Sequence, residues 1–321
     1  MHTPWRPGSV DVLFLCAMAE RGWRVFSTAI LTVVLALLLA LGVARAASSA
    51  PATGSIVFSA HPEGTGAAQL FRVDPAGTGL AQITTGSLPA TAPAFSPDGK
   101  HLVFVRLGSG IFRVDLDGTG LHRLTSGKRD NHPAWSPDGR RIAFLRPVRK
   151  EWRVYMMPSS DGRQIRLPDA PPAGKPTWTA NGKSLYVPAA GDLVRIDART
   201  GKILKFYGLA LDVQTGQTAT VSPNGSKVAF IGPRISTGPP DCGEGPCPQY
   251  GLYLANLRKP HRQRRIVNDT GPAGWSPNGA SIVFVSRGAL VLRVVATGAT
   301  TSIAVGSHVA AGDTAPAWQP G

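Results

Sequence analysis

Short apolar runs, each preceded by a polar turn, recur along most of this chain. PAWSPDGRRIAF at 133–144 shows the unit: a proline and an aromatic residue, a turn of Ser, Pro, Asp and Gly, and then an apolar run. Similar segments begin at 93, 176, 219 and 272, and a truncated copy, PAWQPG, ends the chain. The aromatic position of the repeat is occupied by Phe95, Trp135, Trp178, Val221, Trp275 and Trp318. Successive copies are 40, 43, 43, 54 and 43 residues apart, and a period of this length indicates a repeat architecture.

Each repeat is interpreted as four short strands. The turn residues favour a tight reversal, because proline presets φ, Asp or Asn caps the backbone locally and Gly takes the left-handed conformation. The run after the turn, such as IAF at 142–144, is apolar on both faces, as expected for a strand between two neighbouring sheets. A third run such as IFRVD at 111–115 follows, then a second turn and a short fourth strand. Four antiparallel strands in such a length predict one propeller blade.

The two ends of the chain complement each other. Residues 54–86 supply the second, third and fourth strands of a unit, whereas residues 315–319 supply only a first strand. With five complete blades between them, the sequence predicts an all-β fold, a six-bladed β-propeller with four antiparallel strands per blade. We expect the C-terminal strand to join the N-terminal blade and close the ring, which hides edge strands. The aromatic positions are expected to pack between blades, each indole N–H with one partner.

The pattern PAWSPDG…IAF…FRVD…LT resembles the TolB-type, WD-repeat-like β-propellers of bacterial envelope proteins. The resemblance covers nearly everything from about residue 54 to the end. It implies the propeller fold and a place in the cell envelope, and it does not identify a ligand. TolB itself carries an additional α/β domain before its propeller. We expect no such domain here, so functions that depend on it are not implied.

An apolar stretch precedes the repeats. Residues 25–44 are flanked by Arg21 and Arg24 and end in an Ala-Arg-Ala segment. They predict a leader over 1–46, followed by a linker at 47–53 and the propeller at 54–321; a start at Met18 would give a compact basic flank. Two alternatives stay open, a cleaved signal peptide and an N-terminal transmembrane anchor. On either, the propeller is exported, to the periplasm, the cell envelope or the medium.

The cysteines and a search for catalytic motifs limit the kinds of chemistry that the sequence predicts. Cys242 and Cys247 lie in a Gly- and Pro-rich insertion, and in an oxidising compartment we expect them to form a disulfide. A metal site there would need two further soft ligands, so no metal and no cofactor is expected. The chain contains no G-x-S-x-G, H-E-x-x-H, P-loop or dinucleotide motif, and no catalytic residue is assigned.

The chain is strongly basic, with 34 Lys and Arg against 19 Asp and Glu and a formal charge of +15. An exported protein with this excess meets anionic lipids, wall polymers and acidic proteins rather than nucleic acid. We therefore expect a monomer that binds an envelope protein or an anionic wall polymer, with membrane contact only through an uncleaved leader. The densest basic cluster, RKPHRQRR at 258–265, is interpreted either as a solvated hairpin or as an anion-binding surface.

The candidate site lies in the loops that precede the innermost strands. These loops share one face with those between the second and third strands, and irregular loops carry function more often than uniform turns. SGKRDNHP at 126–133 is one of them, and neighbouring loops add two cations. The predicted channel-mouth residues are Arg106, Lys128, Arg129, Asp130, Asn131, His132 and Lys175. Converging cations suit an anionic ligand or an acidic partner segment. Alternatively, Asp130 pairs with Lys128 or Arg129 and the loop has no further role.

Two functions of different classes follow. The first is a non-enzymatic binding or assembly propeller of the envelope. The second is a channel-site enzyme of lactonase, lyase or hydrolase type acting on a sugar acid, lactone or peptide, because such sites draw residues from separate blades and leave no linear motif. A tightly held divalent ion would favour the enzyme, and salt-sensitive capture of an envelope component would favour the binding module.

Overall fold

Strands form the regular structure of this protein. The computed structural model describes residues 54–62, 66–160, 162–209, 211, 219–233, 250–268, 270–310 and 314–321. These residues fall in the second of two compact units, Ala52–Gly321. The leader and the two cysteines of the insertion lie outside the described residues, so export and the disulfide stay predictions.

Within the described ranges, no helix has the length and hydrophobicity that a membrane crossing requires.

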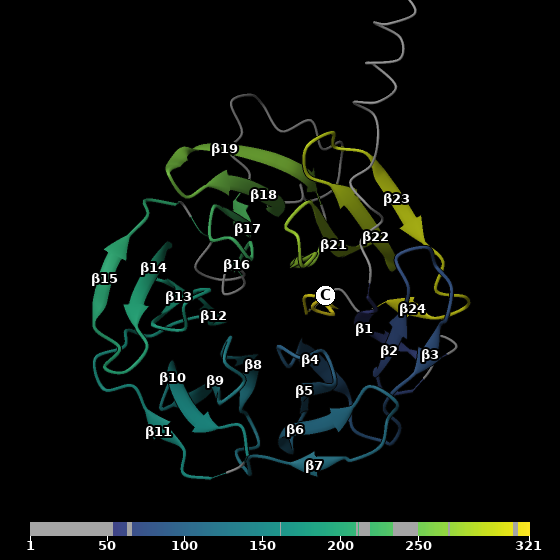
Figure 1. Cartoon of the computed structure of the whole chain (residues 1–321), viewed down its shortest axis with the longest axis horizontal. Coiled ribbons are helices and arrows are strands. Elements are labelled where there is room, and N and C mark those ends of the chain that lie inside the picture. Colours follow the sequence, from purple (N-terminus) through teal and green to yellow (C-terminus); the bar gives the residue numbers. More distant parts are fainter. Residues whose placement is uncertain are drawn as a thin grey trace, which may run out of the picture. The chain divides into compact units, whose positions relative to one another are not determined.

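The strands form six sheets around a central axis, as Figure 1 shows. Blades 1 to 3 comprise β1 (Ile56–His61), β2 (Gln69–Val73) and β3 (Ala81–Gln82); then β4 (Ala90–Phe95), β5 (His101–Arg106), β6 (Gly110–Asp115) and β7 (His122–Arg123); then β8 (Asn131–Trp135), β9 (Arg141–Val148), β10 (Glu151–Pro158) and β11 (Ile165–Arg166). Neighbouring strands within each sheet pair antiparallel.

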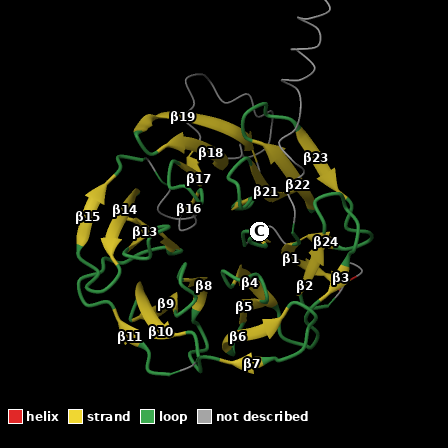
Figure 2. Ribbon diagram, viewed as in Figure 1, coloured by secondary structure: helices red, strands yellow, loops and turns green. Residues whose placement is uncertain are grey.

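The second half of the ring repeats this order. Blades 4 to 6 comprise β12 (Thr177–Trp178), β13 (Ser184–Ala189), β14 (Asp192–Asp197) and β15 (Ile203–Phe206); then β16 (Ala219–Val221), β17 (Lys227–Pro233), β18 (Tyr250–Asn256) and β19 (Lys259–Asn268); then β20 (Gly274–Trp275), β21 (Ser281–Ser286), β22 (Ala289–Val294) and β23 (Thr300–Ile303). Figure 2 shows that strands and loops make up the described part. The predicted all-β, six-bladed fold is confirmed.

The C-terminal strand closes the ring, as expected. In β25 (Ala317–Trp318), Trp318 is the register partner of Ile56 on β1, and the C-terminus lies near the centre of the ring (Figure 1). A second short strand, β24 (Val309–Ala310), pairs with the same edge of β1. The side chain of Gln319 adds two links: its Oε1 accepts from Ser55 N at 2.9 Å, and its Nε2 donates to Gly99 O at 3.0 Å. The last residues therefore hold blade 1 and also contact blade 2.

A recurring side-chain hydrogen-bond pattern explains the turn after each innermost strand. Ser136 Oγ donates to Asp138 Oδ1 at 2.5 Å, and the same Oγ accepts from Arg141 N at 2.9 Å. Equivalent pairs recur in blades 2, 4, 5 and 6: Ser96 with Asp98, Thr179 with Asn181, Ser222 with Asn224 and Ser276 with Asn278. The serine hydroxyl is the main reason that the pKa of Asp138 lies below its usual value. The Ser-Pro-Asp-Gly motif thus encodes a turn with its own internal bonds.

The hydrophobic core lies between the blades. The second strand of five blades places a Phe with at most 2% of its surface exposed at the same position: Phe58, Phe104, Phe144, Phe230 and Phe284. One cluster packs Val103 and Ile111 of blade 2 against Ile142 and Phe144 of blade 3, and comparable clusters join the other neighbours. Because the second strand of each sheet is buried on both faces, it is continuously apolar, as the sequence pattern predicted.

Deleting residues 315–321 is expected to destabilise the fold by several kcal/mol. The deletion uncovers the edge of β1 and removes Trp318, and a buried Trp alone contributes about 3–5 kcal/mol. Deleting only Pro320 and Gly321 leaves β25 and Gln319 in place and serves as the control. Chemical denaturation of the three proteins measures the effect. A longer deletion as stable as the control would show that β25 does not close the ring.

Candidate functional site

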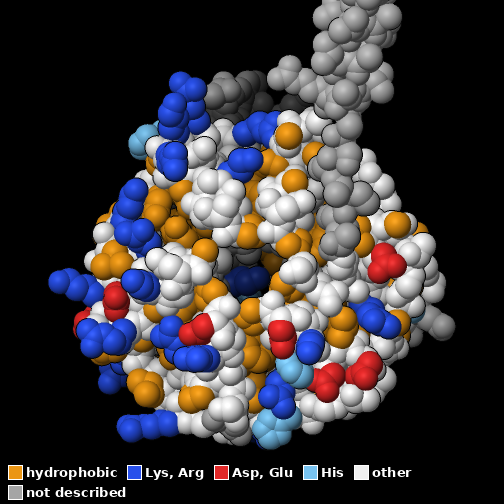
Figure 3. All heavy atoms as spheres, viewed as in Figure 1, with side chains coloured by type: hydrophobic (Ala, Val, Ile, Leu, Met, Phe, Trp, Pro, Cys, Tyr) orange, Lys and Arg blue, Asp and Glu red, His pale blue; other side chains and the backbone are white. Residues whose placement is uncertain are grey.

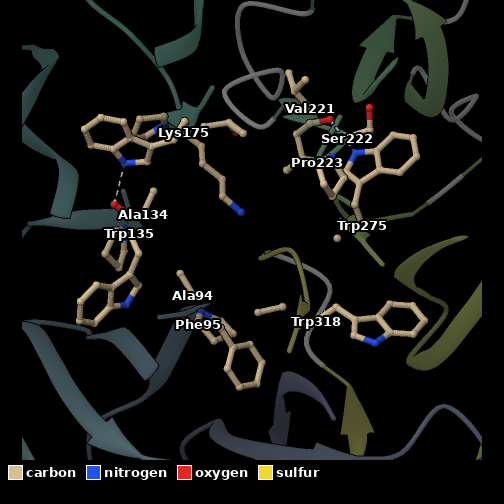
Figure 4. Close-up of a pocket in the computed structure, with 18 of the residues that line it drawn as sticks. Ala94, Phe95, Ala134, Trp135, Lys175, Val221, Ser222, Pro223, Trp275 and Trp318 are labelled. Carbon is tan, nitrogen blue, oxygen red and sulfur yellow. Dashed lines mark hydrogen bonds between the residues drawn. The ribbon is translucent and has the colours of Figure 1, made fainter. Parts of the chain in front are cut away.

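The six innermost strands surround a central cavity of about 460 Å³. Each blade contributes the residues around its repeated aromatic position, so Phe95, Trp135, Trp178, Val221, Trp275 and Trp318 all line it. Figure 4 shows several of these side chains around the opening. Proline and alanine fill most of the remaining wall, including Pro93, Pro133, Pro176, Pro223 and Pro316. The wall is therefore mainly apolar and rigid.

Lys175 brings a charge into this apolar channel. It lies two residues before β12, and its side chain extends into the central space in Figure 4. Figure 3 shows a basic side chain deep in the central opening. Lys175 is the one charged residue among the described residues that line the cavity, and it forms no ion pair with any of the described carboxylates. Because the surrounding protein displaces water, the pKa of Lys175 falls to about 8.

His132 occupies the equivalent position in the preceding blade. Lys175 precedes Pro176 and Trp178 as His132 precedes Pro133 and Trp135. Burial, and secondarily the charge of Lys175, lower the pKa of His132 to about 3, so its imidazole is neutral at physiological pH. Both residues are partly exposed, and of the two only Lys175 lines the cavity. The pair therefore carries one positive charge, located on Lys175.

The backbone at His132 is bulged. Its φ is 49°, and the register with β9 shifts between Asn131 and Ala134. Ala92 has the same place in blade 2, with a φ of 51° and a comparable shift. Since Ala92 carries no functional group, the bulge is a feature of the propeller and not of a histidine site. Its effect is to turn residue 132 out of the strand pleat.

Asp130 is used in a buried ion pair within blade 3. Its side chain is fully buried and forms a bidentate ion pair with Arg146, with Oδ2–Nη2 and Oδ1–Nε distances of 2.6 and 2.7 Å. Arg146 also donates to Gln164 Oε1 at 2.6 Å. The alternative that Asp130 pairs with Lys128 or Arg129 is therefore wrong, because strand β9 presents a planar guanidinium directly beneath the loop. Asp130 anchors SGKRDNHP to blade 3.

The remaining predicted site residues divide between loop surface and structural contacts. Arg106 donates to Thr85 O at 3.0 Å, and its guanidinium lies 5.8 and 5.7 Å from the ring centres of Phe104 and Phe112. Lys128 and Arg129 are exposed, and Arg129 lies over Trp152. Asn131 Oδ1 accepts from His132 N at 2.8 Å. The structure thus places Lys175 in the channel and His132 close enough to be affected by its charge, whereas the other members lie on the loop or within the blades.

Two of the channel tryptophans join adjacent blades through their indoles. Trp178 Nε1 donates to Ala134 O at 3.0 Å, and Trp275 Nε1 donates to Thr220 O at 2.8 Å. Trp135 Nε1 is buried without a partner among the described residues. The expectation of one partner for each indole N–H is therefore wrong for Trp135.

A signal in the sequence could have singled out Lys175 and its neighbour His132. Both His132 and Lys175 stand directly before Pro-X-Trp, so aligning the repeats places them in one ring of positions. The sequence prediction grouped candidate residues by the loop they belong to, and it did not use their equivalent positions in the repeats. Within the described part of the chain, no group of three or more His, Cys, Asp or Glu residues could hold a metal ion. What the arrangement can do chemically is to hold an anionic group in an apolar channel.

Comparisons with known proteins agree on the architecture. A family model described as the TolB beta propeller domain matches residues 36–182 and 89–234. The crystal structure of TolB from Acinetobacter baumannii is similar, with a TM-score of 0.65 and 20% identity, over 84% of this chain and 68% of that one. The structure of a TolB described as putative from Agrobacterium tumefaciens is also similar. It has a TM-score of 0.59 and 16% identity, over 83% of this chain and 94% of that one. At these identities the two structures support the fold alone. The search of curated proteins found no match.

Replacing Asp130→Asn is expected to destabilise the protein by roughly 3 kcal/mol. The change keeps the size of the side chain but leaves the mostly buried guanidinium of Arg146 without a counter-charge. Lys128→Met, two residues away and exposed, is the matched control and should change stability by less than about 0.5 kcal/mol. Urea unfolding measures both. Equal stability of the two variants would contradict the anchoring role of Asp130.

Lys175→Met is expected to stabilise the fold at pH 7, raising the melting temperature by roughly 2 °C. The pKa of about 8 lies below the unfolded value of 10.5, so the unfolded state binds more protons between these pH values. The wild-type penalty is therefore complete below pH 8 and disappears as the pH rises to about 10.5. Thermal unfolding at pH 7 and pH 10.5 tests this, with exposed Lys183→Met as control. A stabilisation that persists unchanged at pH 10.5 would contradict the electrostatic explanation.

Proposed function

This chain belongs to the TolB β-propeller family, and on that basis we propose that it is an exported, envelope-associated and non-enzymatic binding module. Its channel, in this proposal, receives an acidic segment of a partner protein. TolB-type propellers generally act as binding modules, commonly bind proteins and belong to the periplasm. The observation that carries the choice of ligand is Lys175, a cation without a counter-charge inside an apolar channel.

The electrostatics of Lys175 favour a carboxylate. Burial already lowers the pKa of this amine, which means that the channel disfavours its charged form in the absence of a ligand. A carboxylate placed beside it would satisfy the ammonium and restore its ordinary pKa. Such charge-assisted hydrogen bonds are about twice as strong as neutral ones, and they are screened least where water is displaced. The neutral imidazole of His132, close to Lys175, offers a further hydrogen bond.

The shape of the channel favours a peptide segment over a single small ion. Its volume of about 460 Å³ accommodates a few residues in extended conformation, and pockets of this size generally combine apolar walls with few polar groups. Indoles and prolines around the wall offer apolar surface to the side chains on either side of a ligand carboxylate. The described lining residues provide no observation that favours the channel-site enzyme.

An acidic pentapeptide with apolar flanks should bind the full-length protein, and the channel tryptophans provide a fluorescence signal. Lys175→Met is expected to weaken binding at least about ten-fold, whereas Lys183→Met in the same blade should leave it unchanged. A peptide with Gln in place of Glu should also bind about ten-fold more weakly. Binding should decrease as the pH rises above about 8, because Lys175 then loses its proton.

Equal affinity of the wild type and the Lys175→Met variant for the acidic peptide would overturn the proposed site. Equal affinity for the Glu and Gln peptides would instead show that the channel recognises the shape of the peptide and not its charge. Calorimetry near pH 8 in buffers of different ionisation enthalpy adds an independent readout, because binding at Lys175 must take up protons.

A further inference from the structure

The outer strand of blade 4, β15, is unusually apolar for an exposed strand. All four of its residues are exposed, and Ile203, Leu204 and Phe206 show 37%, 47% and 58% of their surface. The described part of the chain has seven large hydrophobic residues with such exposure, so nearly half of them lie on this one strand. Single exposed apolar side chains need no explanation, but a contiguous set of them on an edge strand indicates a contact surface.

Basic residues surround this apolar strand. Lys202 and Lys205 belong to the same segment of blade 4, and both are exposed. The outer strand of blade 5, β19, exposes a further set of basic side chains: Lys259, His261, Arg262, Arg264 and Arg265. Neither residues 198–209 nor residues 250–268 include an Asp or Glu. The RKPHRQRR cluster begins with Arg258 in the hairpin turn before β19 and continues along that edge strand.

The two strands form one surface along the rim of the propeller. A side chain beginning at Gly208, just after β15, would meet His261 Cε1 of β19 at 3.6 Å. Figure 3 shows Lys and Arg side chains gathered along the part of the rim where Figure 1 places β15 and β19. We call this surface, made of residues 202–206 and 259–265, the basic rim.

We propose that the basic rim docks on a lipid bilayer surface rich in anionic phospholipid. Cations reach the headgroup phosphates while Leu204 and Phe206 insert beside them among the acyl chains, which is how interfacial amphipathic segments bind. A hydrated anionic polymer would engage the cations but would leave the apolar side chains in water. A solvated hairpin would explain the charges only. The combination of both residue types on one rim therefore favours the bilayer.

This surface differs from the predicted membrane contact, which the sequence assigned to the leader alone. It is also independent of the channel site, because it lies on the outermost strands of blades 4 and 5. Docking by the rim would place the channel axis roughly along the membrane plane. Both mouths of the channel would then stay open to a partner protein.

Hydrogen–deuterium exchange of the full chain tests the proposal. The protein is added to vesicles of equal parts phosphatidylglycerol and phosphatidylcholine, or of phosphatidylcholine alone. The leader is present in every sample, so the readout is local: deuterium uptake of peptides covering 202–208 and 259–265. We expect uptake there to slow about ten-fold with anionic vesicles and to stay unchanged with neutral ones, and high salt should reverse the protection.

Two variants matched in charge and hydrophobicity make the test specific. Lys202→Glu/Phe206→Ser/Arg262→Glu alters the basic rim and should abolish the protection. Lys100→Glu/Leu121→Ser/Arg140→Glu makes the same changes at exposed positions of blades 2 and 3 and should retain it. Because all six residues are exposed, both variants should melt close to the wild type, which thermal unfolding verifies.

Three outcomes would overturn the proposal. Uptake unaffected by anionic vesicles would show that the rim does not contact lipid. Equal loss of protection in the control variant would show a general effect of net charge. Equal protection by a soluble polyanion such as polyphosphate, in place of vesicles, would assign the rim to a charged polymer instead of a bilayer.

Discussion

Burial of both faces of every blade is the constraint on which the rest of this structure depends. Each second strand is apolar on its two sides, and residues such as Phe104 and Phe144 are covered only because a neighbouring sheet packs against them. A linear stack would leave its first and last blades uncovered, and pairing of β25 with β1 removes both ends at once. The few residues that close the ring therefore also protect the core between the blades. The two hydrogen bonds of Gln319, one to Ser55 and one to Gly99, lie beside this closing strand.

Closure also produces the channel and sets its chemistry. Six copies of one innermost strand meet at the axis, so the residue before each Pro-X-aromatic segment belongs to a single ring of positions. Four blades have this segment, and in blades 1 and 2 the occupants of the ring are the buried Ala315 and Ala92. In blades 3 and 4 they are His132 and Lys175, and the surrounding protein leaves the first neutral and the second with a lowered pKa. A lysine at this one position of the repeat thus places a charge where little water is present.

The two surfaces proposed for binding use charge in opposite ways. The channel has a single cation whose hydration is reduced, so one carboxylate can have a large and specific effect there. The basic rim has many solvated cations, each with a small effect that salt screens, and it adds exposed Ile203, Leu204 and Phe206. Because the inner strands of each blade are buried between sheets, the channel and the outer strands are the places where side chains remain accessible to a partner.

The sequence by itself determined the number of blades, their strand order and the closing strand, because turn chemistry and two-sided apolar runs are local signals that repeat six times. It also named Lys175 and His132 as candidates. Only the tertiary structure decided which members of the SGKRDNHP loop share a site: Asp130 turns inward to Arg146, Arg129 lies over Trp152, and Lys175 comes from the next blade. Those contacts depend on distances between strands far apart in the chain. Burial and pKa follow from such distances, so no reading of neighbouring residues along the sequence could supply them.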